Sequence, residues 1–228
     1  MQSWHRPAHE RPAVNPALAG VALAVVVGAV IAGSARNARA AILGLVVALV
    51  FGPLLTEPTA QALGLAARLV GSILAGYLLW VAARGSGVRT GGSRLGWPAE
   101  VLVAAAAAVV GYASHGLGAP AVGPAAAQAA GFALAALSVA MIAHGRDIVR
   151  IGIGLLLLAS AAILVRTALG GTPEPLEQIL IAGLMAALGG AVAVLAVSAR
   201  ADGTDFELTA DRLRRPRRIA DAHPIDPR

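Results

Sequence analysis

The sequence predicts an all-α, polytopic membrane protein of seven transmembrane helices. It is 57% hydrophobic and 13% charged, with a mean hydropathy of +0.75, which is too apolar for a soluble domain of this length. Its apolar runs of about 16 to 24 residues do not alternate with polar residues, so they fit membrane-spanning helices and not barrel strands.

Arginine placement is the third observation that predicts this class. Fourteen of the eighteen arginines fall in three gaps between apolar runs, at 35–40, 84–96 and 144–150, and in the tail that begins at Ser198. Every second gap has this composition, and Arg-bearing loops remain cytoplasmic. The pattern predicts a multi-pass protein of a bacterial cytoplasmic membrane, with the N-terminus outside and the C-terminus in the cytoplasm.

The predicted spans, in order, are 17–34, 40–55, 61–83, 97–114, 125–143, 151–169 and 179–197. A cleaved signal peptide is the alternative for the first, although its apolar run is long for one. The second is short and carries Gly52 and Pro53, so its outer end is the least regular. Trp80 and Trp97 flank the second arginine-bearing gap, between the third and fourth spans, where an aromatic belt is expected.

The first three spans and the last three share a layout. Each unit has an arginine-bracketed inner turn, R-N-A-R from Arg36 and R-D-I-V-R from Arg146, and an outer turn E-P-x-x-Q-x-L, from Glu57 and from Glu174. Equivalent helices of the two units are four helices apart, an even number, so both units have the same orientation. This predicts a parallel repeat joined by the fourth helix, with coincidence as the alternative because Glu-Pro often begins a helix.

The expected organisation follows from these boundaries. An extracytoplasmic segment (1–16) precedes the first three-helix unit (17–83). Residues 84–124 form an inner loop, the fourth helix and an outer loop. The second three-helix unit (125–197) and a basic tail (198–228) complete the chain.

Two intramembrane arginines are candidate functional residues. Arg68 lies roughly 10 Å below the outer end of the third span. It is either a buried cation paired with an outer acid (Glu57, Glu174 or Glu177) or an arginine that snorkels from a helix starting near Ala67. Arg166, one turn from the outer end of the sixth span, is expected to snorkel.

Glu100 is the candidate intramembrane acid. It lies just inside Trp97 at the inner end of the fourth span. It is either an embedded carboxylate that contacts a partner subunit, or a first-turn acid favoured by the helix dipole and close to Arg94. His115 and His144, at opposite span ends, are expected to be interface residues, with a proton relay as the alternative.

Small residues recur at helix-packing spacings in three spans. The first span has Gly20, Ala24, Gly28 and Ala32; the third has Ser72 and Gly76; the seventh has Gly183, Ala187 and Gly190.

The chemistry of the remaining polar residues excludes several function classes. The chain has no cysteine, and its sequence contains no nucleophile–base pair, metal cluster or cofactor fingerprint, so we expect no enzyme, metal or cofactor. Its arginines line membrane borders, which argues against nucleic-acid binding. The cytoplasmic tail has a basic cluster suited to anionic lipids or to a docking partner, formed by Arg212, Arg214, Arg215, Arg217 and Arg218.

A family resemblance rests on residues 140–200. The residues that carry it are Arg146, Asp147, Arg150, Ile153, Gly154, Leu155, Glu174, Glu177 and Gln178. This stretch resembles the K subunit of respiratory complex I and the C subunit of multisubunit cation/proton antiporters. The seven-span layout, with a tail pattern G-x-D-x-E-L-T from Gly203, is similar to component E of hydrogenase-4 and formate hydrogenlyase.

The resemblance implies a membrane subunit of an ion-translocating or redox-linked complex, packed beside antiporter-like subunits. The K subunit carries buried carboxylates in its second and third spans, but this chain has 156–159 (LLLA) and 183–186 (GLMA) at those depths. A proton route needs titratable or hydrated groups, so a packing and scaffolding role is expected.

Two alternatives remain open. The first is a self-contained small transporter, or another membrane protein, built on the duplicated three-helix unit. It requires a polar pocket between the units, with Arg68 and Glu100 facing inward. The second is a membrane anchor whose tail recruits a soluble partner.

Overall fold

The computed structural model describes residues 15–56, 62–84, 96–117, 121–145 and 147–201. Within them every regular element is a helix: α1 (Pro16–Ser34), α2 (Ala38–Phe51), the 3-10 turn η1 (Gly52–Leu55), α3 (Ala62–Ala83), α4 (Trp97–Ala113), α5 (Ala125–His144), α6 (Ile148–Gly170) and α7 (Pro175–Ala201). Each predicted span corresponds to one of these helices. The protein is therefore an all-helical polytopic membrane protein, as predicted.

Six of these helices are long and apolar enough to cross a membrane, when α2 and η1 are taken as one span. The seventh, α4, has 17 residues, the lower limit of the range for a spanning helix. Large apolar side chains point outward all around the bundle; Leu23, Leu102 and Leu184 are 65%, 70% and 59% exposed. Water would penalise so much exposed apolar surface, whereas hydrocarbon does not.

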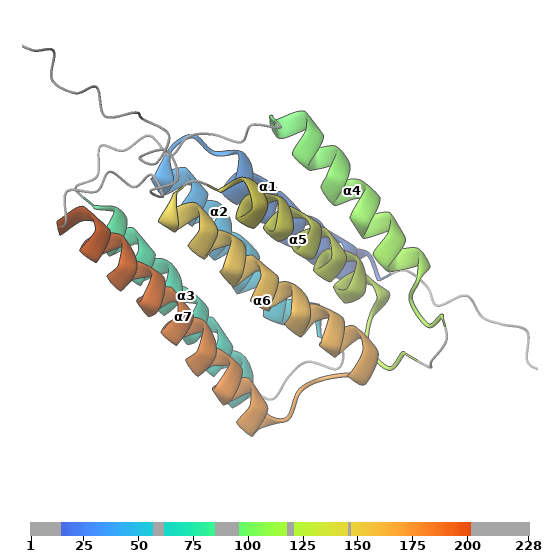
Figure 1. Ribbon diagram of the computed structural model, residues 1–228. Helices are drawn as coiled ribbons and strands as arrows, with labels where there is room; N and C mark the ends of the chain where they lie inside the picture. The colour runs from blue at the N-terminus through green and yellow to red at the C-terminus, as the bar shows by residue number, and fades with distance from the viewer. Residues whose placement is uncertain (1–14, 57–61, 85–95, 118–120, 146, 202–228) are drawn as a thin grey trace, which may run out of the picture.

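The helices pair across the two predicted units. Helix α3 lies against α7, α1 against α5, and α2 against α6, so each helix of the first unit contacts its counterpart in the second. Figure 1 shows α3 and α7 together at one side of the bundle and α4 at the other. Helix α4 packs mainly on α5 and less extensively on α1.

The inner turns of the two units have the same backbone geometry. Ala35 has φ −63° and ψ 131°, and Gly145 has φ −68° and ψ 125°. Two residues on, Asn37 and Asp147 cap α2 and α6, each accepting the backbone N–H two positions ahead at 3.0 Å. The side-chain oxygen satisfies one of the N–H groups left open at a helix start.

The crossing of the first two helices is also equivalent in the two units. Gly44 and Gly154 are 110 positions apart, as are Asn37 and Asp147. A Cβ on Gly44 would meet atoms of residues 28, 31 and 32 of α1, and a Cβ on Gly154 would meet atoms of residues 138, 141 and 142 of α5. The Gly44 contact is the closer, at 2.6 Å from the Gly28 carbonyl oxygen and the Ala32 nitrogen. Glycine is needed there because the two backbones touch.

The helices α3 and α7 also cross on small residues. A Cβ on Gly71 would lie 2.6 Å from the Ala182 carbonyl oxygen, and one on Gly189 would lie 2.8 Å from Ala75 Cα. The predicted small-residue stripes are therefore only partly interfaces. Gly28 is one, but Gly20 and Gly183 have open space where a Cβ would project.

Candidate functional site

The helix α4 places Glu100 in its first turn, at the arginine-rich end of the bundle. The helix starts after Gly96, whose φ of +79° suits glycine, and Trp97-Pro98 forms its first positions. Glu100 is only 5% exposed. The predicted intramembrane carboxylate is thus turned toward the other helices.

Arg150, in the first turn of α6, faces Glu100 across the bundle. Its Nη2 lies 3.7 Å from Glu100 Oε1 and donates a 2.8 Å hydrogen bond to the Gly33 carbonyl oxygen, close to the end of α1. The first distance is a charge contact, and only the second has hydrogen-bond length. One guanidinium therefore joins α1, α4 and α6.

Gly33 makes room for this cluster. A Cβ on Gly33 would lie 3.2 Å from Glu100 Oε2, and that oxygen has no hydrogen-bond partner in the described part of the chain. Two opposite charges buried together at the helix starts hold the peripheral helix α4 in register. Arg94, the neighbour expected for Glu100, lies outside the described residues, and Arg150 is the partner that the structure gives.

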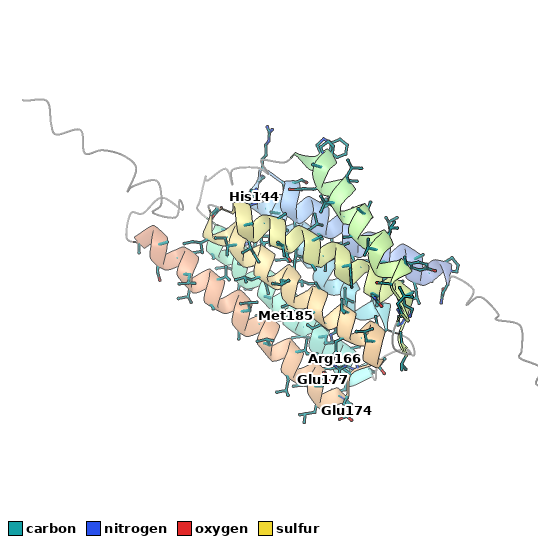
Figure 2. The ribbon with its side chains drawn as sticks, turned by 45° about the vertical axis from the view of Figure 1, so that its right-hand side comes forward. His144, Arg166, Glu174, Glu177 and Met185 are labelled. Atoms are coloured by element: carbon teal, nitrogen blue, oxygen red, sulfur yellow. The ribbon has the colours of Figure 1, made fainter. Side chains whose placement is uncertain are left out.

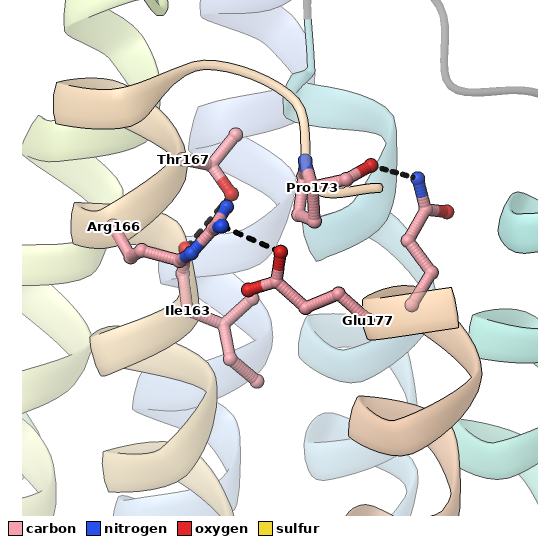
Figure 3. A network of polar contacts seen from close by, with 6 residues as sticks. Ile163, Arg166, Thr167, Pro173 and Glu177 are labelled. Atoms are coloured by element: carbon pink, nitrogen blue, oxygen red, sulfur yellow. Dashed lines mark hydrogen bonds and ion pairs between the residues drawn. The ribbon is translucent and has the colours of Figure 1, made fainter. Parts of the chain in front are cut away.

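At the opposite end of the bundle, Arg166 of α6 meets Glu177 of α7. Its Nη2 lies 2.5 Å from Glu177 Oε2, with the two side chains 47% and 33% exposed (Figure 3). Figure 2 shows this pair near Glu174, with His144 toward the other end. Arg166 thus stays near the bundle surface, and its partial exposure makes this pair worth little stability.

Of the two alternatives for Arg68, its burial favours the buried cation, although no ion pair joins it to Glu174 or Glu177 in the described residues and Glu57 lies outside them. The helix α3 begins at Ala62, not near Ala67, and Arg68 is 7% exposed. It lines a small, partly open cavity of about 20 Å³ between α2, α3, α6 and α7, together with Ser72 and Ser160. The close α3–α7 crossing, where a Cβ on Gly71 would meet Ala182, lies next to this cavity, because Ala182 also lines it.

Gln178, from the family-like segment, is buried one turn farther out. It is 1% exposed and donates from Nε2 to the Pro173 carbonyl oxygen at 2.8 Å (Figure 3). Its Oε1 lies where a Cβ on Gly64 would project and lacks a hydrogen-bond partner among the described residues. Gln178 therefore fastens the start of α7 to the preceding turn and to α3.

The other residues of the family-like segment lie at the two ends of the bundle. Asp147 caps α6, and burial raises its pKa, opposed by the Val149 N–H and the charge of Arg150. Glu174 is exposed. Arg146 and the tail cluster Arg212, Arg214, Arg215, Arg217 and Arg218 lie outside the described residues.

A polar network between α4 and α5 was not predicted. Gln128, which is 5% exposed, lies with Oε1 2.8 Å from His115 Nδ1 and donates from Nε2 to Ser114 Oγ at 3.1 Å. This network joins the opposite end of α4 to α5. The sequence signal for this network is a glutamine in the first turn of an apolar helix that follows a serine and a histidine at the end of the preceding helix.

The cavities limit what the bundle can bind. A half-open groove of about 840 Å³ runs along α1, α4 and α5, lined by apolar side chains apart from Asn15, Tyr112 and His115 at one end. The Arg68 cavity is polar but small. Within the described residues no three His, Cys, Asp or Glu side chains gather as metal ligands.

Fold and site together define, over the described residues, a seven-helix membrane protein with a buried charged side chain toward each end. No protein-family model, no curated protein and no solved structure matches the chain.

Proposed function

We propose that this chain is an integral membrane subunit of a multisubunit ion-translocating or redox-linked complex. Its role there is to pack beside antiporter-like subunits and hold their helices. The supporting likeness is the segment from Arg146 to Gln178, which resembles the K subunit of complex I and its counterpart in the multisubunit cation/proton antiporters. The seven-helix architecture agrees with hydrogenase-4 component E.

The observation that carries the scaffolding role is the absence of titratable groups along the second unit. In the described residues, α6 has no ionisable side chain between Arg150 and Arg166, and α7 has none between Glu177 and Arg200. A proton crossing the hydrocarbon needs such groups or ordered water. Two of the charges at the helix starts, Glu100 and Arg150, instead contact each other between α4 and α6.

Co-purification tests this proposal. Affinity purification of the tagged full chain in a mild detergent should retain other membrane subunits in fixed ratio, because a scaffold is held by its neighbours. Their identity is read by mass spectrometry. Recovery of a stable, lone monomer under conditions that keep known membrane complexes intact would contradict it.

A small-ion transporter is the second candidate, favoured by one specific observation. Arg68 and Glu100 are both buried and turned inward, and the Arg68 cavity lies between helices of the two units. The cavity volume of about 20 Å³ leaves room only for an ion or a water molecule. An organic substrate would need a larger polar chamber.

The basic tail is proposed to bind anionic lipid on the cytoplasmic side, at about 1 kcal/mol per basic residue. Replacing its five clustered arginines by glutamine in the full chain should lower the anionic phospholipid that co-purifies. Unchanged lipid content together with loss of a soluble protein from the purified material would favour the docking alternative.

A further inference from the structure

The Arg68 cavity has features that the packing of the bundle does not require. It is a partly open space between four helices, with Ser72 on α3 and Ser160 on α6 among its lining residues. Gly52 and Pro53 of the 3-10 helix η1, which follows α2 directly, also line it. The remaining lining residues are apolar, so Arg68, Ser72 and Ser160 supply its polar side chains.

Arg68 has no counter-charge in contact with it. Within the described residues it forms no hydrogen bond and no ion pair, although 93% of its surface is buried, since 7% is exposed. Glu177, whose charge also acts on Arg68, forms its ion pair with Arg166. Glu174 at the same end is exposed, and Glu57 lies outside the described residues.

A buried guanidinium without an ion-pair partner in contact is costly in hydrocarbon. A water molecule in the cavity would solvate it but leave the net charge, whereas an anion would remove the net charge as well. The volume of about 20 Å³ exceeds the roughly 10–15 Å³ that one water molecule needs, and excludes a polyatomic anion such as phosphate.

The hydroxyls can complete such a site. Ser72 Oγ now donates to the Leu49 carbonyl oxygen at 3.3 Å, and Ser160 Oγ to the Leu156 carbonyl oxygen at 2.9 Å. The first hydrogen bond is long, so little is lost when that hydroxyl rotates toward a ligand. The lining includes no acid, which would repel an anion.

We propose that this cavity binds one small inorganic anion of the halide class, such as chloride, with Arg68 as its counter-charge and Ser72 as a hydroxyl donor. The bound anion neutralises the centre where the two three-helix units meet. The site is independent of whether the chain works in a complex or alone. In a complex, the bound anion would stabilise the fold. In a chain that transports ions alone, the site would provide an ion-binding step.

Halide-dependent thermal unfolding of the purified full chain tests the proposal. Unfolding is followed in detergent while sodium bromide replaces sodium gluconate at constant ionic strength. At a bromide concentration ten times its dissociation constant, the melting temperature should rise by about 3 °C. Arg68→Gln should abolish this rise. Arg166→Gln is the matched control and should keep it, since Arg166 already has an acid partner.

A direct measurement covers the case in which Arg68→Gln does not fold. Crystals of the wild-type chain grown in bromide should give an anomalous peak beside the Arg68 guanidinium, and Ser72→Ala should weaken the halide response. Absence of both the peak and the halide response would show that the cavity holds water only and overturn the proposal. An equal response in wild type and Arg68→Gln would do so too, because it reports a general salt effect.

Discussion

Glu100 and Arg150 form a buried charge contact of 3.7 Å between the first turns of α4 and α6. Arg150 also hydrogen-bonds the Gly33 carbonyl oxygen of α1, so the contact ties the peripheral helix to both units. Removing one partner leaves the other charge buried alone, and this destabilises the folded protein more than replacing both charged side chains.

The first prediction concerns this pair. Arg150→Met should destabilise the protein by about 3 to 5 kcal/mol, because Glu100 would remain buried without compensation. The double variant Arg150→Met with Glu100→Gln should recover most of the loss. Thermal or denaturant unfolding in detergent measures both. Additive effects of the two single changes would contradict the structural role of the pair.

The second prediction concerns the crossing of α1 and α2. Gly44→Ala should cost about 1 to 3 kcal/mol, because the added methyl group would lie 2.6 Å from backbone atoms of α1. Gly154→Ala should cost less, since its nearest neighbour is a side-chain atom, Ile142 Cγ1 at 2.9 Å, and the nearest backbone atom is 3.3 Å away. Gly20→Ala is the control, with open space around it. Equal stability of all three variants would rule out the close crossing.

The third prediction is a pH dependence set by Asp147. Burial raises the pKa of this carboxyl in the folded protein above its ordinary value of 3.8, so the folded state binds the proton more tightly than the unfolded state. Its contribution to stability is therefore greatest at low pH and falls as pH rises through the folded pKa.

Replacing Asp147 separates this effect from helix capping. Asp147→Asn should remove the pH-dependent part and keep the cap, because Asn37 makes the equivalent bond in α2. Asp147→Ala should be about 1 kcal/mol less stable than Asp147→Asn at every pH, because it lacks the cap as well. The readout is the melting temperature across the acid range, and parallel curves for wild type and Asp147→Asn would contradict the assignment.

The fourth prediction concerns orientation. The chain has no cysteine, so single cysteines placed at Ser3 and at Ser198 can be labelled without background. A membrane-impermeant maleimide should label the first in intact cells and the second only after lysis, because arginine-rich turns remain cytoplasmic. Labelling of Ser198→Cys in intact cells, and of Ser3→Cys only after lysis, would show that the topology is the opposite of the predicted one.

The sequence was sufficient for the number and order of the helices, because length, hydropathy and arginine placement are local properties. Glu100 and Arg68 could be recognised as unusual for the same reason. Their neighbours could not be predicted. That Glu100 meets Arg150, and that Arg68 is buried, depends on which helices touch and at what depth.

Those contacts are in turn set by particular small residues. Gly71 lets α7 approach α3 at Ala182, a residue that lines the Arg68 cavity, and Gly33 leaves space for the Glu100 carboxylate. Several small residues in this Ala-rich chain have the same spacing, and periodicity alone does not separate Gly28, which is an interface, from Gly20, which is not. Whether such a residue lies at an interface depends on where the two helices cross: Gly28 faces α2, and Gly20 faces open space.

Proton flux in proteoliposomes tests the central claim most directly, namely that the buried charges hold helices together and do not conduct. The purified chain alone, reconstituted with a lumenal pH-sensitive dye under an imposed membrane potential, should give proton entry no faster than protein-free vesicles. Flux well above that background, abolished by Glu100→Gln in a variant that still folds, would contradict the scaffolding account.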